Sequence, residues 1–160
     1  MHHHSLLLAG FAMKDTEEIS ELVRSLLASQ RFAVIATESE GQPYSNLVAF
    51  AEADNLRSLL FVTGRNTRKY SNTLTSKRVS VLIDDRTNRP SDLKRAIAVT
   101  ALGTIEEVAA NCRGRLAAIY LSKHPQLEDF LRRPSSALMR VAVTDYIVAG
   151  FETVRRLHTG

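Results

Sequence analysis

The chain has 160 residues, 44% of them hydrophobic and 24% charged, proportions typical of one soluble globular domain. Its net charge is +4, and because lysine and arginine are spread along the whole chain, the charge does not point to a nucleic-acid partner. No apolar run approaches the roughly 20 residues that a membrane-spanning helix needs. The one cysteine, Cys112, excludes an internal disulfide and fits a reducing, cytoplasmic compartment.

The N-terminal segment differs from the rest of the chain. His2–His4 are followed by the apolar run Leu6–Ala12, and no lysine or arginine precedes that run, so a secretion signal is not indicated. We expect residues 1–14 to be a disordered leader or the remnant of an affinity tag. Since neither a repeat nor a Pro/Gly-rich linker divides the remainder, residues 15–160 are expected to form one domain.

Apolar residues recur at helical spacing soon after this segment. Within Asp15–Gln30 the spacing i, i+3, i+4, i+7, i+8 predicts a helix with one buried face, formed by Ile19, Leu22, Val23, Leu26 and Leu27. Further helices are predicted over Asn66–Ser76, over Asn111–Lys123 and in a short segment that begins at Pro125 and ends near Arg133.

Seven short apolar or alternating segments predict β-strands. They are Arg31–Thr37, Pro43–Glu52, Leu59–Thr63, Arg78–Asp84, Ala96–Glu106, Ala137–Val143 and Tyr146–Phe151. Glu40-Gly41 and Thr144-Asp145 are expected to form hairpin turns, and Gly103 marks a bulge or bend. Because most neighbouring strands are joined by short turns, the pattern favours antiparallel pairing, and closure of the sheet removes its exposed edges. The predicted fold is mainly β, an antiparallel barrel of about seven strands with flanking helices.

Hydroxyls and cations gather where the third predicted strand meets the following helix. Thr63, Arg65, Thr67, Arg68 and Lys69 lie within seven residues, and Thr67 or its neighbour Asn66 is suited to cap the helix. A phosphate dianion binds to positive charges, to hydroxyl donors and to the free N–H groups of a helix N-terminus. These residues therefore form a candidate phosphate site, and the alternative is a solvated basic turn that caps a helix.

Four anchor segments in the same order resemble the pyridoxamine 5'-phosphate oxidase-like FMN-binding split barrels. They are RFAVIATESEGQPYSNLVAF, LLFVTGRNTRKYSNTLTSKRVSVLIDD, AVTALGTIEEV and RVAVTDYIVAGF. The best single motif, Val62-Thr63 followed by Thr67-Arg68-Lys69, is similar to the phosphate signature of that family. The resemblance covers nearly all of the chain from Phe32 to Phe151 and implies an FMN-binding split β-barrel.

The resemblance also assigns cofactor-binding residues. In the family the flavin ring lies along the second strand and takes backbone hydrogen bonds from it, which implies roles for Asn46, Leu47 and Val48. The phosphate signature implies contacts from Val62, Thr63, Thr67, Arg68 and Lys69. Family members pair as homodimers with the flavin between the chains, so we expect a homodimer that binds FMN.

Several positions depart from the true oxidase of this family. Asn46 and Ala51 stand where the oxidase has basic residues, Ala98 stands where it has a glutamine near the flavin, and the chain has no tryptophan. Vitamin B6 chemistry is therefore not expected. The sequence predicts a flavin-dependent oxidoreductase that acts on an unidentified small molecule, with NAD(P)H as one possible electron donor. The alternatives are a non-catalytic flavin-binding protein, a haem-binding or haem-degrading protein, and a barrel that works through protein contacts alone.

No catalytic residue is assigned from the sequence. His124 precedes Pro125 and is expected in a surface turn. His158 lies near the C-terminus, where the haem-binding relatives in this resemblance use a histidine as an iron ligand, and the alternative is an ordinary tail residue. Cys112 has no neighbouring base that would activate it. His, Cys and Asp residues nowhere show the spacing of a metal site.

Overall fold

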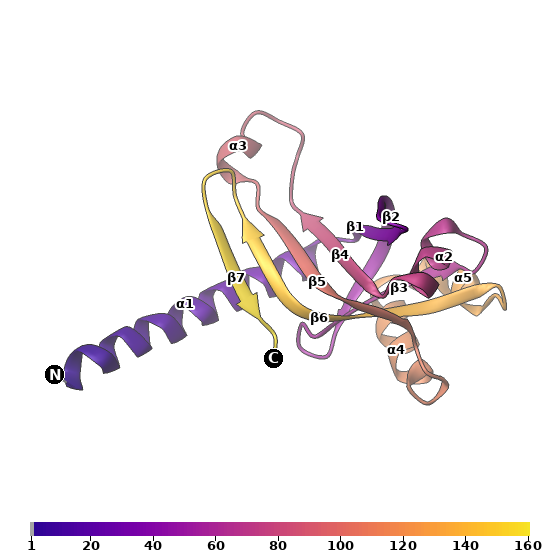
Figure 1. Cartoon of the computed structure of the whole chain (residues 1–160), viewed down its shortest axis with the longest axis horizontal. Coiled ribbons are helices and arrows are strands. Elements are labelled where there is room, and N and C mark those ends of the chain that lie inside the picture. The colour runs from indigo at the N-terminus through magenta and orange to yellow at the C-terminus, as the bar shows by residue number, and fades with distance from the viewer. Residues whose placement is uncertain (1) are drawn as a thin grey trace.

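A closed antiparallel barrel organises the chain (Figure 1). The computed structural model describes the backbone of residues 2–160 and the side chains of residues 15–160. The side chains of residues 1–14 are not described, so the assignment of this segment as a leader or tag remnant stays a prediction. The strands are β1 (Phe32–Ser39), β2 (Gln42–Ala53), β3 (Ser58–Gly64), β4 (Arg78–Asp84), β5 (Ala98–Glu107), β6 (Ser136–Ala149) and β7 (Val154–His158). The helices are α1 (His2–Ser29), α2 (Arg68–Thr75), α3 (Asp92–Arg95), α4 (Ala110–Lys123) and α5 (Glu128–Arg132), with a 3₁₀ turn, η1 (Pro125–Leu127).

Strand pairing closes the barrel through its third and sixth strands. The sheet order is β3-β2-β1-β4-β5-β6-β7, and an additional pairing joins β3 to the first half of β6. The second half of β6 carries β7 instead. All pairings are antiparallel, which confirms the predicted mainly-β barrel of about seven strands.

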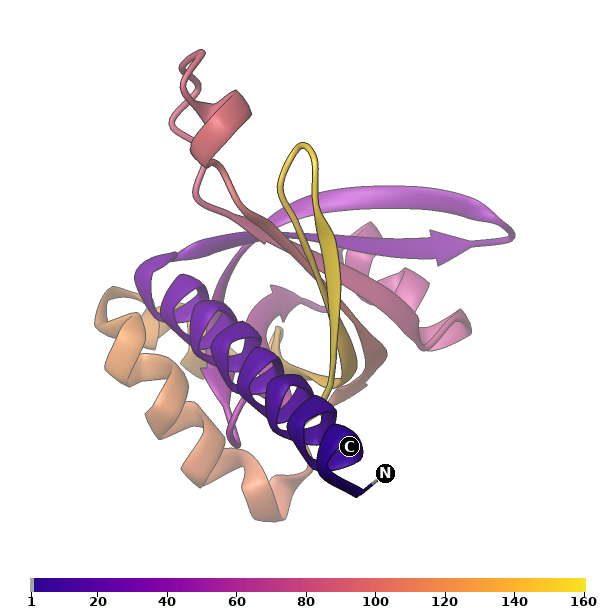
Figure 2. The same ribbon diagram turned by 90° about the vertical axis from the view of Figure 1, so that its left-hand side faces the viewer.

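Two apolar layers hold the fold together. Inward side chains of the strands fill the barrel, and the predicted apolar face of α1 packs against them through Ile19, Val23, Leu26 and Leu27, so that this helix crosses one end of the barrel (Figure 2). A second cluster lies outside β2, β3 and β6, beneath α4 and α5, and contains Leu60, Val62, Leu116, Tyr120, Leu131 and Leu138. Each large aliphatic side chain buried in this way stabilises the fold by about 1.5–3 kcal/mol.

The hairpin predicted at Thr144-Asp145 is wrong, because β6 runs unbroken through these residues. The register with β5 pairs Leu102 with Asp145 and Gly103 with Val143, so Thr144 is the extra residue of a β-bulge. The bulge bends β6 between its two partners, β3 and β7. The true turn follows Ala149, and the strand β7 after it was not predicted from the sequence.

His124 is buried, which overturns the prediction of a surface turn residue. Its Nε2 lies 2.7 Å from the carbonyl oxygen of Phe50, and its ring centre lies 5.1 Å from that of Tyr120. Next to it, Lys123 donates to the carbonyl of Leu27 at 2.8 Å and to the carboxylate of Glu52 at 2.9 Å. The end of α4 is thereby fixed to both β2 and α1.

One row of outward side chains crosses five strands of the barrel wall. Register pairs Leu47 with Val34, Val34 with Leu82, Leu82 with Thr100, and Thr100 with Ile147. We call this row the open sheet face. Leu47 is 68% exposed and the other four members are partly exposed, so the face offers an apolar surface to solvent. Among the described residues, no helix has both the length and the apolar character needed to cross a membrane.

Candidate functional site

The turn between β3 and α2 brings the predicted hydroxyl groups together. Thr63 is the last fully buried residue of β3, and its Oγ1 lies 3.1 Å from Oγ1 of Thr67. Thr67 is the N-cap of α2, since its hydroxyl accepts from the amide of Tyr70 at 3.2 Å and also donates to the carbonyl of Gly64 at 2.9 Å. The first N–H groups of α2 have no acceptor within the helix and point out of its start. The turn therefore offers free backbone N–H donors at the start of α2, whereas the hydroxyls of Thr63 and Thr67 already donate to the carbonyl of Gly64.

Two cations follow this cap without a counter-charge. Arg68 lies with its guanidinium carbon 5.5 Å from the centre of the Tyr44 ring, and Nζ of Lys69 lies 5.9 Å from the centre of the Phe61 ring. Neither side chain has a hydrogen-bond or ion-pair partner within residues 15–160. Lys69 is half-buried, and this desolvation lowers the pKa of its ammonium group below the ordinary value of 10.5. A desolvated, unpaired ammonium beside an unpaired guanidinium favours the approach of an anion.

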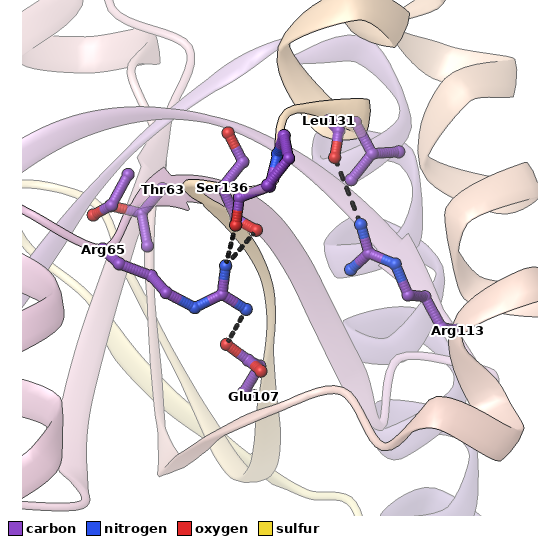
Figure 3. A network of polar contacts seen from close by, with 8 residues as sticks. Thr63, Arg65, Glu107, Arg113, Leu131 and Ser136 are labelled. Atoms are coloured by element: carbon purple, nitrogen blue, oxygen red, sulfur yellow. Dashed lines mark hydrogen bonds and ion pairs between the residues drawn. The ribbon is translucent and has the colours of Figure 1, made fainter.

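Arg65 has a different role from its neighbours (Figure 3). Its Nη1 donates to the carbonyls of Pro134 at 2.8 Å and Ser136 at 2.7 Å, and its Nη2 pairs with Glu107 at 2.7 Å. Its backbone amide also donates to the carbonyl of Ser135. With its donors engaged in this way, Arg65 joins the β3–α2 turn to the start of β6 and contributes no free charge to the predicted phosphate site.

The second strand presents its predicted residues on both faces of the sheet. Val48 is buried in the barrel core, Leu47 points outward on the open sheet face, and Asn46 points inward opposite Ile35. Oδ1 of Asn46 is buried and has no hydrogen-bond partner within residues 15–160. A buried amide without a partner costs free energy, so this group marks a place where a donor from a ligand is accommodated favourably.

Apart from the residues of β2, the predicted cofactor-binding residues fall into two places. Thr63, Thr67, Arg68 and Lys69 lie together at the start of α2, and the contact of Arg68 with Tyr44 joins them to the edge of β2. The side chain of Val62 packs instead in the cluster beneath α4, so only its backbone is available to a ligand. Tyr44 and Phe61 lie next to the two cations. Neither is assigned to the phosphate site from the sequence, because both lie on strands and only the fold brings them to α2.

A second group of polar side chains lies at the junction of β6 and β7. Register places His158 opposite Asp145, and Nδ1 of His158 contacts the carboxylate of Asp145. Arg156 binds the same carboxylate at 3.1 Å, and this hydrogen bond holds the pKa of Asp145 below its ordinary value. The His158 side chain is 72% exposed, so its second ring nitrogen is open to a ligand. Figure 1 places β7 and α2 in different parts of the barrel.

No group of three or more His, Cys, Asp or Glu side chains in residues 15–160 is arranged to hold a metal ion. The polar contacts of Figure 3 also include the bond from Arg113 to the carbonyl of Leu131, at 3.1 Å, which joins α4 to α5. That contact is structural, since it links two helices that cover the barrel.

Comparison with protein families gives one match that spans most of the chain. The sequence profile described as pyridoxamine 5'-phosphate oxidase matches residues 19–147. No curated protein matches the sequence.

Solved structures with the same fold are numerous, and the three described here share 13–20% sequence identity with this chain. A haem-binding protein from Mycobacterium smegmatis superposes with a TM-score of 0.78 at 16% identity, over 87% of this chain and 57% of that one. A FAD-binding protein from Mesorhizobium loti has a TM-score of 0.59 at 20% identity, over 83% of this chain and 89% of that one. HutZ, the haem storage protein of Vibrio cholerae, has a TM-score of 0.67 at 13% identity, over 77% and 88%. At such identities these likenesses establish the split-barrel fold, and this chain spans little more than half the length of the mycobacterial protein.

Proposed function

Because this chain belongs to the pyridoxamine 5'-phosphate oxidase family, we propose that it binds FMN and acts as a flavin-dependent oxidoreductase on an unidentified small molecule. The observation that carries this proposal is the pair of unpaired cations, Arg68 and Lys69, directly after the Thr67 cap. The terminal phosphate of FMN supplies the negative charge that this pair lacks.

The residues present fit such a cofactor. Arg68 offers a planar fork of donors, Lys69 offers a point charge, and the first N–H groups of α2 complete the phosphate cradle. The Thr67 hydroxyl fixes the start of this helix by capping it, and does not itself donate to the ligand. The buried Oδ1 of Asn46 gives a donor group of the ligand a partner near the second strand. A bound flavin supplies hydride transfer, for which NAD(P)H is our proposed electron donor, while the protein orients and encloses the ring.

A homodimer is the oligomeric state that we propose. Leu47, which is 68% exposed, lies at the β2 end of the open sheet face, next to Val34 of β1. An apolar row of this kind loses contact with water when a second copy packs on it. Since the backbone of Asn46–Val48 is the segment expected to meet the flavin ring, such packing also brings the partner near the cofactor. We propose a cytoplasmic location, because a chain with one cysteine needs no oxidising compartment.

A visible absorption spectrum of the purified protein, followed by titration with FMN and then with riboflavin, tests the proposal. Removing both cations, Arg68→Ala with Lys69→Ala, is expected to weaken FMN binding by about a hundredfold or more while leaving riboflavin binding within about threefold. The matched control is Arg132→Ala with Arg133→Ala, which removes the same charge from the end of α5 and its C-cap. Equal losses for FMN and riboflavin in the test variant would remove the phosphate role.

The same titration separates catalysis from storage. If FMN binds stoichiometrically and NAD(P)H bleaches the flavin band, the oxidoreductase assignment is supported. If FMN binds tightly and neither NADH nor NADPH reduces it, the protein is a non-catalytic flavin-binding protein, in line with the oxidase residues that Asn46, Ala51 and Ala98 replace.

Haem binding is the second candidate, and the contact between His158 and Asp145 favours it. A carboxylate at one ring nitrogen orients the imidazole and makes the other nitrogen a better metal ligand. Haem addition is then expected to give a Soret band that His158→Ala removes and Asp145→Asn weakens. Retention of the full band in His158→Ala would exclude His158 as the iron ligand, whatever the outcome with FMN.

A further inference from the structure

A groove lies where α1, the β4–β5 connection and the β6–β7 turn meet. Its volume is about 360 Å³, which falls in the range of small-molecule sites, roughly 300–1,000 Å³. Figure 2 shows the three segments on the same side of the molecule, with α1 in front of the barrel and the loop that carries α3 projecting beyond it. The groove therefore lies away from the start of α2 and belongs to neither site described above.

The floor of the groove is apolar. Four aliphatic side chains line it: Ile19 and Leu22 of α1, Ile97 before β5, and Val148 of β6. Ile19 and Val148 are core residues, and Leu22 and Ile97 pack against that core while remaining partly exposed. A hydrocarbon chain placed on this floor removes apolar surface from water on both partners, which favours binding.

The rim of the groove is cationic. Lys94, Arg95 and Arg155 line it together with a single acid, Glu18. Arg155 has only an exposed contact with Asp15 at 3.5 Å, and the side chains of Lys94 and Arg95 have no ion-pair or hydrogen-bond partner within residues 15–160. The rim thus carries more positive than negative charge, and two of its cations are available to a ligand.

Hydrogen bonds restrain the loop that presents these cations. The carboxylate of Asp92 accepts from the amides of Thr87 and Asn88, both at 2.8 Å, and from the hydroxyl of Thr87 at 2.7 Å. At its end, the carboxylate of Asp85 accepts from the amide of Ile97 at 2.8 Å. Because these hydrogen bonds restrain the loop, binding at its cations costs less conformational entropy than binding at an unrestrained loop.

We infer that this groove binds a medium-chain monocarboxylate, with the hydrocarbon chain on the floor formed by Leu22, Ile97 and Val148 and the carboxylate between Lys94 and Arg95. The two features together select this class of ligand. An apolar floor alone would accept any hydrocarbon, and a cationic rim alone would accept any anion, whereas a molecule with one charged end and one apolar end satisfies both. The inference is independent of FMN, since no residue of the groove contributes to the phosphate cradle.

Titration of the ¹⁵N-labelled protein with octanoate, observed by two-dimensional NMR, tests the inference. Saturable shifts are expected at the amides of Ile97, Val148 and Gly150, which line the groove. Replacement of octanoate by 1-octanol, which keeps the chain and removes the charge, is expected to weaken binding by about tenfold. The measurement is made with and without saturating FMN, and the same octanoate affinity is expected in both.

Substitutions at the rim provide the matched comparison. Lys94→Gln with Arg95→Gln is expected to weaken octanoate binding by about tenfold, whereas Arg89→Gln, in the same loop but outside the groove, leaves it unchanged. All three positions are exposed, so these variants are expected to fold as the parent does. The inference is overturned if the octanoate shifts do not saturate or are confined to the open sheet face. It is also overturned if 1-octanol binds as tightly as octanoate, or if the rim variant and the Arg89 control lose octanoate affinity equally.

Discussion

The ammonium of Lys69 lies 5.9 Å from the centre of the Phe61 ring, and no carboxylate within residues 15–160 neutralises it. Phe61 belongs to the barrel core, so Lys69 extends over the apolar end of the barrel and loses part of its hydration. The result is a cation that the fold desolvates and does not pair. An incoming phosphate offsets the free-energy cost of this desolvation, because it supplies the missing opposite charge.

The first prediction concerns the pH dependence of FMN binding. Phosphate binding requires protonated Lys69, and burial lowers its pKa below 10.5, so the charge is lost at a lower pH than for an exposed lysine. FMN affinity, relative to riboflavin affinity, is therefore expected to fall as the pH rises from about 7 to about 10. Fluorescence titration of both ligands across this interval measures the ratio.

Lys69→Arg is the control for this prediction. A guanidinium stays protonated over the whole interval, so the variant is expected to bind FMN with a ratio that no longer changes with pH. If the variant keeps the pH dependence of the parent, the titrating group is not Lys69, and the role of its ammonium in phosphate binding would have to be abandoned.

The second prediction compares two arginine–glutamate pairs with equal separations. Arg65 pairs with Glu107 and Arg132 pairs with Glu128, both at 2.7 Å. Arg65 also donates to the carbonyls of Pro134 and Ser136, whereas Arg132 is an exposed i,i+4 contact within one short helix.

Arg65→Ala is therefore expected to lower the free energy of unfolding by about 1–3 kcal/mol, and Arg132→Ala by about 0.5 kcal/mol or less. Urea unfolding at fixed protein concentration measures both. Because Arg65 secures the turn that leads to Thr67, its replacement is also expected to weaken FMN binding, even though its own charge is already paired. Equal stability of the two variants would show that the carbonyl contacts contribute nothing.

The third prediction tests the dimer. Leu47→Glu places a charge at the most exposed position of the open sheet face, where a second copy would have to bury it, so it is expected to shift the protein from dimer to monomer. Ala118→Glu adds the same charge to the exposed side of α4 and is expected to leave the dimer intact. Light scattering of parent and variants at several concentrations decides between these outcomes, and a monomeric parent would contradict the dimer itself.

The sequence predicted the barrel well, because strand alternation and short turns are local signals. Each of the first five predicted strands lies at its observed place within a few residues, and the N-cap at Thr67 was among the two options considered. The error came at Thr144-Asp145, where two polar residues interrupt an apolar run. A turn and a β-bulge both produce that pattern, and only the pairing of β6 with β5 distinguishes them.

The sequence also predicted part of the candidate site, because the residues of that part lie close together along the chain. The order Thr63, Thr67, Arg68 and Lys69 identifies the β3–α2 turn, which the structure places as one group. The sequence could not separate Arg65 from the other cations, because its partners, Glu107 and Ser136, lie far along the chain. Burial of His124 was missed because the carbonyl of Phe50, which it contacts, comes from a strand 74 residues away.

The last prediction uses two glycines with opposite surroundings. A Cβ added at Gly103, beside the bulge, would lie 2.2 Å from the backbone oxygen of Ala142, whereas one added at Gly114 in α4 would meet no atom within 4 Å. Backbone of the paired strand β6 cannot move aside without breaking the barrel register. Gly103→Ala is therefore expected to destabilise the protein by about 1–3 kcal/mol or more. Gly114→Ala is expected to stabilise it by about 0.5–1 kcal/mol, since alanine loses less conformational entropy in a helix.

Thermal unfolding at one protein concentration, without FMN, measures both changes and avoids a contribution from ligand binding. A neutral Gly103→Ala would mean that the bulge adjusts freely and does not fix the bend of β6.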